Sequence, residues 1–249
     1  MKAVLLAAGY ATRLYPMTKN MPKSLLPVGG QAIIGHILDK ISEVAAIDEV
    51  YIVTNDRFYH QFADWLTENP QDNVVHVLND GTSSNETRLG ALGDLQLTLD
   101  HYGVDEDVMV LAGDNLFDFS LEDFVAFFRD KQADCITAHV LDDRRRLQTS
   151  GIITVDEEQR VLTFDEKPVE PRSNLAVPPF YLYRQATLPL LRQYLEAGEN
   201  PDAPGHFIPW LIERRPVYAY IFAGERYDIG TPESFAEAQA IFSRSDQSS

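Results

Sequence analysis

The chain has 249 residues, with 38 acidic against 21 basic side chains, a formal net charge of −17 and a single cysteine. This charge argues against nucleic acid as a partner, because duplex binding depends on neutralising many phosphates with basic groups. A single cysteine excludes an internal disulfide and a metal site built from several thiolates. The sequence shows neither a targeting pattern nor an apolar run of membrane-spanning length, so the cytoplasm is the expected compartment.

Short apolar runs alternate with helical patterns along the chain. Strands are expected at residues 3–8, 49–54, 74–78, 108–112, 135–141, 151–155, 180–183 and 217–222. Helical spacing of apolar residues occurs at 33–41, 121–128, 188–195, 207–212 and 235–241. Strands separated by helices favour parallel crossovers, and therefore a doubly wound α/β sheet in a single domain over residues 1–243, followed by a disordered tail at 244–249.

The loop that follows the first expected strand is basic. It carries Arg13, Lys19 and Lys23 and no acid, and the first acidic residue of the chain is Asp39. In so acidic a protein, this favours a pocket for a polyanion, which the backbone would approach closely at Gly9. A solvated basic loop is the alternative, but its several prolines and the buried run before it argue against that interpretation.

A carboxylate follows the buried run at 108–112. Asp114 lies in the sequence Gly-Asp-Asn, directly after this expected strand. In a doubly wound sheet, ligands bind at the carboxyl ends of the parallel strands, so we expect Asp114 to lie close to the loop around Gly9. It is either a ligand for a hard cation such as Mg²⁺ or the start of a turn, and spacing alone leaves both open. Asp228 precedes a helix that Pro232 would begin, and either Asp228 or Thr231 could cap that helix.

The opening segment resembles the signature L-A-A-G-x-x-x-R-L-x-P-x-T, followed by P-K, of the sugar-phosphate nucleotidyltransferases, such as glucose-1-phosphate thymidylyltransferase. The matching residues are Leu6, Ala7, Ala8, Gly9, Arg13, Leu14, Pro16, Thr18, Pro22 and Lys23. Ala11 departs from the pattern, since many members have glycine there. The resemblance covers nearly the whole chain and implies a Rossmann-like doubly wound, mixed and mainly parallel sheet.

The resemblance implies that a nucleoside triphosphate and a sugar 1-phosphate give a nucleotide sugar and pyrophosphate, with dTTP or UTP and glucose 1-phosphate as the first expectation. It implies catalysis by Arg13, Lys23 and Asp114, with Mg²⁺ as cofactor on Asp114 and Asp228. The nucleotide would bind at Leu6, Ala7, Ala8, Gly9, Arg13, Lys23, Gly90 and Asp114. The sugar phosphate would bind at Gly151, Glu166, Lys167 and Val177, where Glu166 and Lys167 resemble the E-K-P motif of the family.

Two departures leave the substrates open. Pro179 replaces a glycine in the acceptor segment, and Arg88 stands where proline is usual in the base-recognising segment around Gly90. A cytidylyltransferase acting on another phosphorylated or phosphonate acceptor therefore stays an alternative. A non-catalytic relative that binds nucleotide sugars is another, although the retained bases and acids of the site argue against it.

The remaining motifs give less information about function. Arg144–Arg146 is expected as a solvated loop, with an effector or acceptor contact as the alternative. The histidines form no pair at metal-binding spacing, and neither a P-loop motif nor a G-x-G-x-x-G after a strand occurs, so a zinc site, a P-loop NTPase and a dinucleotide oxidoreductase are disfavoured. A homo-oligomer stays open.

Overall fold

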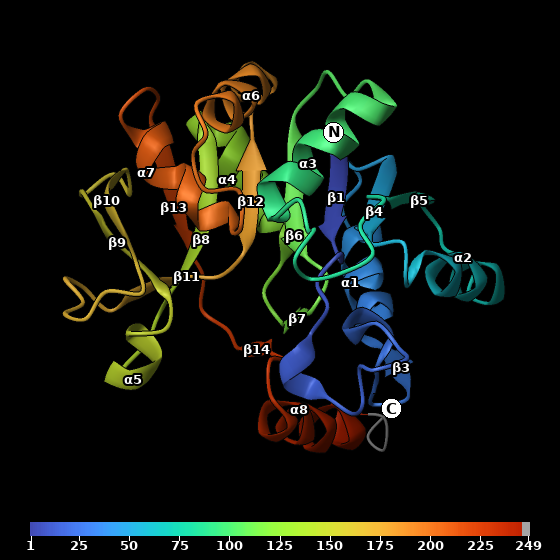
Figure 1. The fold of residues 1–249 in the computed structure, drawn as a ribbon. Helices are drawn as coiled ribbons and strands as arrows, with labels where there is room; N and C mark the ends of the chain where they lie inside the picture. Colours follow the sequence, from blue (N-terminus) through green and yellow to red (C-terminus); the bar gives the residue numbers. More distant parts are fainter. Residues whose placement is uncertain (246–249) are drawn as a thin grey trace.

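A mixed sheet of ten strands crosses the molecule in the computed structural model, which describes residues 1–245 (Figure 1). The strand order is β10-β9-β11-β8-β12-β6-β1-β4-β5, and β13 also pairs with β8. The strands from β6 to β5 are mutually parallel, and β13 is parallel to β8. Strand β12 is antiparallel to both of its neighbours, and an antiparallel extension of β9, β10 and β11 completes the sheet.

The strands of this sheet are β1 (Lys2–Leu6), β4 (Glu49–Thr54), β5 (Val74–Asn79), β6 (Val108–Ala112), β8 (Asp134–Val140), β9 (Gly151–Val155), β10 (Val161–Glu166), β11 (Leu175–Val177), β12 (Phe180–Tyr183) and β13 (Val217–Ile221). Two small antiparallel pairs are β2 (Pro27–Val28) with β3 (Gln31–Ala32), and β7 (Asn115–Phe117) with β14 (Arg226–Asp228). The helices are α1 (Ile33–Ser42), α2 (Tyr59–Glu68), α3 (Ala91–Tyr102), α4 (Leu121–Lys131), α5 (Arg144–Leu147), α6 (Leu188–Glu196), α7 (Phe207–Ile212) and α8 (Pro232–Ser245).

Both faces of the sheet are covered by helices, because successive side chains of each strand point to opposite faces and both sets are apolar. Leu5 of β1 packs in one core with Ile37 of α1 and Phe124 of α4. Its neighbour Val4 packs in a second core with Leu95 of α3. The expected single, doubly wound α/β domain is therefore confirmed.

Most expected elements occur within a few residues of their predicted bounds, and α8 begins at Pro232 as expected. The segment 144–146 differs from the expected loop, because it begins the short helix α5, which the side chain of Asp143 caps by accepting backbone N–H groups. Helix α8 includes residues 244 and 245 of the predicted tail, and residues 246–249 lie outside the described residues. Within the described part, no helix is both long and apolar enough to cross a membrane.

The C-terminal helix α8 lies at the bottom of Figure 1, where it packs on the hairpin of β2 and β3, while the N-terminus lies near the top, at the start of β1. The backbone N–H of Gly29 donates to the side chain of Gln239 at 3.2 Å. The same glutamine donates to the carbonyl oxygen of Pro27, and Phe242 lies directly against Gly29. This packing fixes the far side of the basic loop.

A pair of carboxyl groups joins the segment after β5 to α3. Asp94 is buried and lies in hydrogen-bond contact with Asp80, while Asp80 accepts from the backbone N–H and hydroxyl of Thr82 at 2.7 and 3.0 Å. Burial, together with the neighbouring Asp80, raises the pKa of Asp94 well above its ordinary value. The raised pKa values of Asp94 and Asp80 indicate that one of the two carboxyl groups keeps a proton where free carboxyl groups would have lost it.

We expect this pair to make stability depend on pH. The folded chain keeps a proton that the unfolded chain releases above about pH 4, so the free energy of unfolding should fall as the pH rises from about 4 to about 8, the pKa of Asp94 in the folded chain. Asp94→Asn should flatten this dependence, because an amide donates to Asp80 at every pH. Urea unfolding over this pH range tests it, with Asp64→Asn on the exposed face of α2 as the control. An unchanged slope in Asp94→Asn would rule out the retained proton.

Candidate active site

The residues after β1 form an open rim at the carboxyl end of the sheet. Ala7 and Ala8 are buried, and the amide of Asn55 donates to the carbonyl oxygen of Ala8 at 2.9 Å, which fixes the turn from the adjacent end of β4. Gly9 is exposed, and a Cβ atom built on it would meet nothing within 4 Å. The backbone here is thus open to close approach by a ligand.

The loop then turns through a left-handed residue. Ala11 has φ 46° and ψ 42°, a conformation that costs a non-glycine residue about 1–2 kcal/mol. The buried hydroxyl of Thr18 donates to its carbonyl oxygen at 2.7 Å and holds this conformation. The alanine therefore leaves the tight turn intact. Arg13 follows in a short 3-10 helix (Thr12–Leu14), exposed and without an ion pair to any described residue.

Lys23 closes the site by an ion pair with Asp114. Its Nζ lies 2.5 Å from Oδ2 of Asp114, while the amide of Asn115 donates to Oδ1 at 2.6 Å. Burial alone would raise the pKa of Asp114, but the ammonium of Lys23 and the neighbouring polar groups hold it below its ordinary value. The loops after β1 and β6 thus meet as expected, since the backbone N–H of Gly113 also donates to the carbonyl oxygen of Leu6 at 2.9 Å.

Asp228 reaches the same place from the other end of the chain. The pairing of β7 with β14 sets Asp228 opposite Asn115, and the N–H of Ile229 donates to the carbonyl oxygen of Asp114 at 3.4 Å. Between them lies Arg226, which donates to the Asn115 side chain at 2.6 Å and pairs with Oδ2 of Asp228 at 3.2 Å.

The two carboxylates are chemically suited to Mg²⁺, which prefers oxygen ligands and takes one or two carboxylates beside substrate phosphates. Asp114 pairs with Lys23 and Asp228 pairs with Arg226, and the segments that carry the two acids meet where β7 pairs with β14. Among residues 1–245, no group of three or more histidine, cysteine or acidic side chains gathers in a metal-binding cluster. The donor set fits a cation completed by phosphate oxygens.

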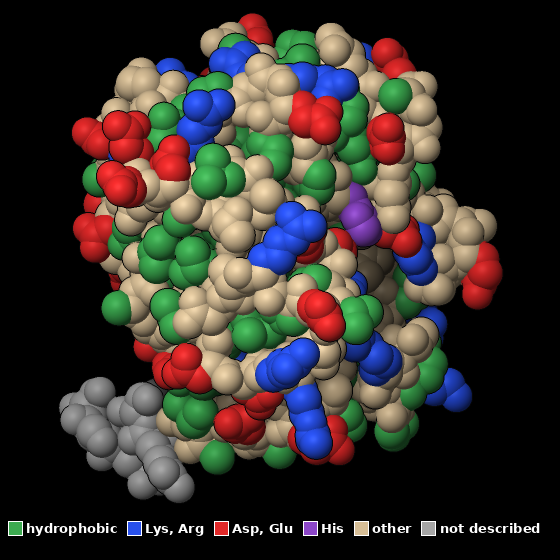
Figure 2. Space-filling model, turned by 90° about the vertical axis from the view of Figure 1, so that its left-hand side faces the viewer, with side chains coloured by type: hydrophobic (Ala, Val, Ile, Leu, Met, Phe, Trp, Pro, Cys, Tyr) green, Lys and Arg blue, Asp and Glu red, His purple; other side chains and the backbone are tan. Residues whose placement is uncertain are grey.

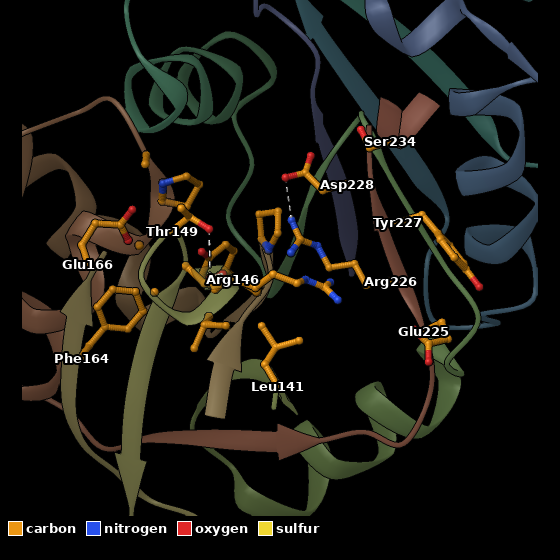
Figure 3. A pocket seen from close by; sticks show the side chains of 18 of the residues that line it. Leu141, Arg146, Thr149, Phe164, Glu166, Glu225, Arg226, Tyr227, Asp228 and Ser234 are labelled. Carbon is orange, nitrogen blue, oxygen red and sulfur yellow. Dashed lines mark hydrogen bonds and ion pairs between the residues drawn. The ribbon is translucent and has the colours of Figure 1, made fainter. Parts of the chain in front are cut away.

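A cavity of about 580 Å³ adjoins this junction (Figure 3), and three of the four residues expected to bind the sugar phosphate line it. Gly151 at the start of β9 lies opposite Glu166 on β10 and opposite Val177 on β11, so the strand register brings them together. Pro179 and Asp228 line the same cavity. We refer to this cavity as the acceptor pocket.

The glycine at 151 is required by its surroundings. A Cβ atom there would lie 2.6 Å from the ring of Phe164 and 3.3 Å from Oε2 of Glu166, and a Cβ atom on Gly205 would lie 2.9 and 3.2 Å from the same two groups. Glu166 thus presents its carboxylate between two backbones without side chains. Lys167, with φ 48°, is exposed, does not line the acceptor pocket and pairs with Glu166 at 3.1 Å.

Gly90 lies at the start of α3 and does not line the acceptor pocket. Its φ of 81° favours glycine, and a Cβ atom would lie 2.6 Å from the carbonyl oxygen of Pro201. Arg88 pairs with Asp202 at 2.9 Å, so this segment is anchored on the loop at 201–202. The glycine thus has a packing role that the sequence did not reveal.

Sequence reasoning did not single out two polar residues of the site, Asn55 and Arg226, and it gave an acceptor contact of Arg146 only as the alternative to a solvated loop. Arg226 could have been found, because it lies two residues before Asp228 on one strand and so shares its face. Asn55 could also have been found, because it is a polar residue directly after the expected strand at 49–54, at the edge of the sheet where ligands bind. Figure 2 shows the face of the molecule that carries β9 and β10, with lysine and arginine side chains bordering a recess.

The sequence of residues 2–245 matches the family model described as Nucleotidyl transferase. A UTP–glucose-1-phosphate uridylyltransferase, AglF of Haloferax volcanii, is 29% identical over 96% of this chain and 95% of its own length. The bifunctional protein GlmU of Methanocaldococcus jannaschii is 27% identical over 96% of this chain, but the match spans only 53% of that longer protein. A glucose-1-phosphate adenylyltransferase of Geobacillus stearothermophilus is 30% identical over 95% of this chain and 64% of its own.

Solved structures agree with this assignment. A putative glucose-1-phosphate thymidylyltransferase from Bacillus anthracis, in complex with a sucrose, has a TM-score of 0.78 at 25% identity and covers 98% of this chain and 95% of its own. An apo UDP-glucose pyrophosphorylase has the same fold, with a TM-score of 0.83 at 20% identity and 98% of both chains covered. The chain therefore belongs to the nucleotidyl transferase family, and its relatives are sugar-1-phosphate nucleotidyltransferases.

Proposed function

We propose that this protein is a Mg²⁺-dependent enzyme that converts a nucleoside triphosphate and a sugar 1-phosphate to a nucleotide sugar and pyrophosphate. UTP or dTTP with glucose 1-phosphate is the first pair to test, since relatives act on glucose 1-phosphate by name. One observation carries the proposal: Asp228 lines the acceptor pocket and also lies beside the Lys23–Asp114 pair. The two substrates would meet at this junction.

The rim around Gly9 and the segment at Gly90 would hold the nucleotide. Gly9 offers an open backbone, and the free guanidinium of Arg13 together with Lys23 would neutralise the triphosphate. Leu6, Ala7 and Ala8 would shape the floor of that site. On the acceptor side, Glu166 would accept hydrogen bonds from sugar hydroxyls beside Gly151 and Val177.

The acceptor phosphate is already an anionic nucleophile, so the reaction needs no general base. One of its oxygens would attack the α-phosphorus in line with the departing pyrophosphate, and catalysis would consist of alignment and charge neutralisation. Arg13 and Lys23 would stabilise the leaving pyrophosphate. Mg²⁺ held by Asp114 and Asp228 would supply further neutralisation of the phosphate charge.

A second candidate is the same transfer to another phosphorylated or phosphonate acceptor, with a cytidine nucleotide included among the donors. Pro179 favours this second candidate, because it lines the acceptor pocket where the family has a glycine. Compared with glycine, proline adds bulk and has no backbone N–H to donate to an acceptor. A cytoplasmic location, a homo-oligomeric state and the absence of nucleic-acid partners stay predictions.

Pyrophosphate release from a grid of nucleoside triphosphates and phosphorylated acceptors tests the function. We expect turnover for at least one sugar 1-phosphate in the presence of Mg²⁺ and none after chelation. Turnover only with a non-sugar acceptor would select the second candidate. Silence for every pair, with nucleotide sugars still bound, would instead indicate a regulatory relative.

Asp114→Asn and Asp228→Asn should each lower kcat by about 10²–10³-fold, because each removes a negative oxygen from the junction. The thermal midpoint should stay near the wild-type value for Asp228→Asn, whose side chain is exposed. Asp142→Asn, an exposed acid outside the acceptor pocket, is the control. Near-normal turnover in both site variants would remove the carboxylates from the mechanism.

Glu166→Gln should raise the KM for the acceptor by about 10- to 100-fold, because hydrogen bonds from sugar hydroxyls to a charged acceptor are lost. The KM for the nucleotide should change less than about twofold, since Glu166 lies only in the acceptor pocket. Glu170→Gln, exposed on the same chain segment, is the matched control. An effect confined to the nucleotide would contradict this role.

A further inference from the structure

Two guanidinium groups lie in the middle of the acceptor pocket, those of Arg146 and Arg226 (Figure 3). Arg226 is largely buried and fully engaged with Asn115 and Asp228. The guanidinium of Arg146 has neither a hydrogen bond nor an ion pair to any residue from 1 to 245. It is the one of the two that is free to bind a ligand.

The backbone of Arg146 is held firmly. The side chain of Asp143 accepts its N–H at 3.4 Å, and its carbonyl oxygen accepts the hydroxyls of Thr149 and Ser150 at 3.0 and 2.9 Å. The next residue, Leu147, is buried in a small apolar cluster beneath α5. Arg144 and Arg145, on the same helix, do not line the pocket. The fold therefore aims one arginine of the three inward.

The side chain of His139 interacts electrostatically with Arg146. His139 on β8 is buried against Phe222, and burial, with the charges of Arg226 and Arg146, lowers its pKa to about 4. The imidazole of His139 is therefore neutral at pH 7 and offers Arg146 no charged partner.

Position within the pocket identifies the ligand group. Glu166 lies at one side of the pocket and Asp228 at the other, with Arg146 between them (Figure 3). If Glu166 binds the sugar and Asp228 lies at the reacting phosphates, the acceptor phosphate must lie between them. The other expected phosphate ligand, Lys167, does not line the pocket, and its ammonium group is already paired with Glu166.

We propose that Arg146 binds the phosphate group of the acceptor, a dianionic phosphate monoester, through the planar fork of its guanidinium. This deepens the proposed function, on which it rests. Arg226 is a positioning residue beside it, because Asn115 and Asp228 hold its own guanidinium in place.

Steady-state pyrophosphate release tests the proposal with Arg146→Ala, Arg146→Lys and the matched control Arg145→Ala. We expect Arg146→Ala to raise the KM for the sugar 1-phosphate by about 10- to 100-fold, with the KM for the nucleotide changed less than about twofold. Arg146→Lys should recover part of the loss, because a point charge is restored without the bidentate fork. Arg145→Ala should behave as wild type.

Binding without turnover separates this proposal from the proposed function. Calorimetric titration in EDTA, with the nucleoside triphosphate present, uses the best acceptor of the grid, or glucose 1-phosphate if no pair turns over, and glucose as the neutral probe. Weaker binding of the phosphate ester only in the Arg146 variants supports the proposal, even if every turnover assay is silent. Equal binding by Arg146→Ala and Arg145→Ala, or no binding of the ester to the wild type, overturns it.

Discussion

The ion pair between Lys23 and Asp114 is the contact on which the site depends. It joins the loop after β1 to the loop after β6, two adjacent parallel strands whose carboxyl ends define the rim. In a chain of net charge −17, phosphates would be repelled almost everywhere else. Lys23 stabilises the ionised form of Asp114 at the rim, and its ammonium group lies where we propose that a triphosphate binds.

The parallel and the antiparallel parts of the sheet position different parts of the candidate site. The parallel strands around β1 carry the rim, Lys23 and Asp114, while the antiparallel extension of β9, β10 and β11 builds the acceptor pocket. The small pair of β7 and β14 connects them, because it carries Asp114's neighbour on one strand and Asp228 on the other. The two regions that we propose to bind the substrates thus adjoin each other within the one domain that residues 1–245 form.

Local patterns in the sequence were enough to predict the central strands, the basic loop and the helix that begins at Pro232, because each depends on residues close together in the chain. The approach of Asp228 to Asn115 depends on a pairing between distant segments, and only the family resemblance suggested it. Arg146 was hidden in a run of arginines that looks solvated, since nothing local shows which of them the fold turns inward. Gly90 was recognised, but its packing against Pro201 involves a distant loop and could not be predicted.

The packing of α8 on the hairpin of β2 and β3 has a consequence for folding during synthesis. Gln239 and Phe242 support Gly29, so the basic loop emerges from the ribosome long before its support does. Since nascent chains form structure from the N-terminus onward, the central strands can assemble early while the binding rim stays unsupported. A chain stalled before Pro232 would expose these cations without the support of α8, and the rim would become complete only after α8 has emerged.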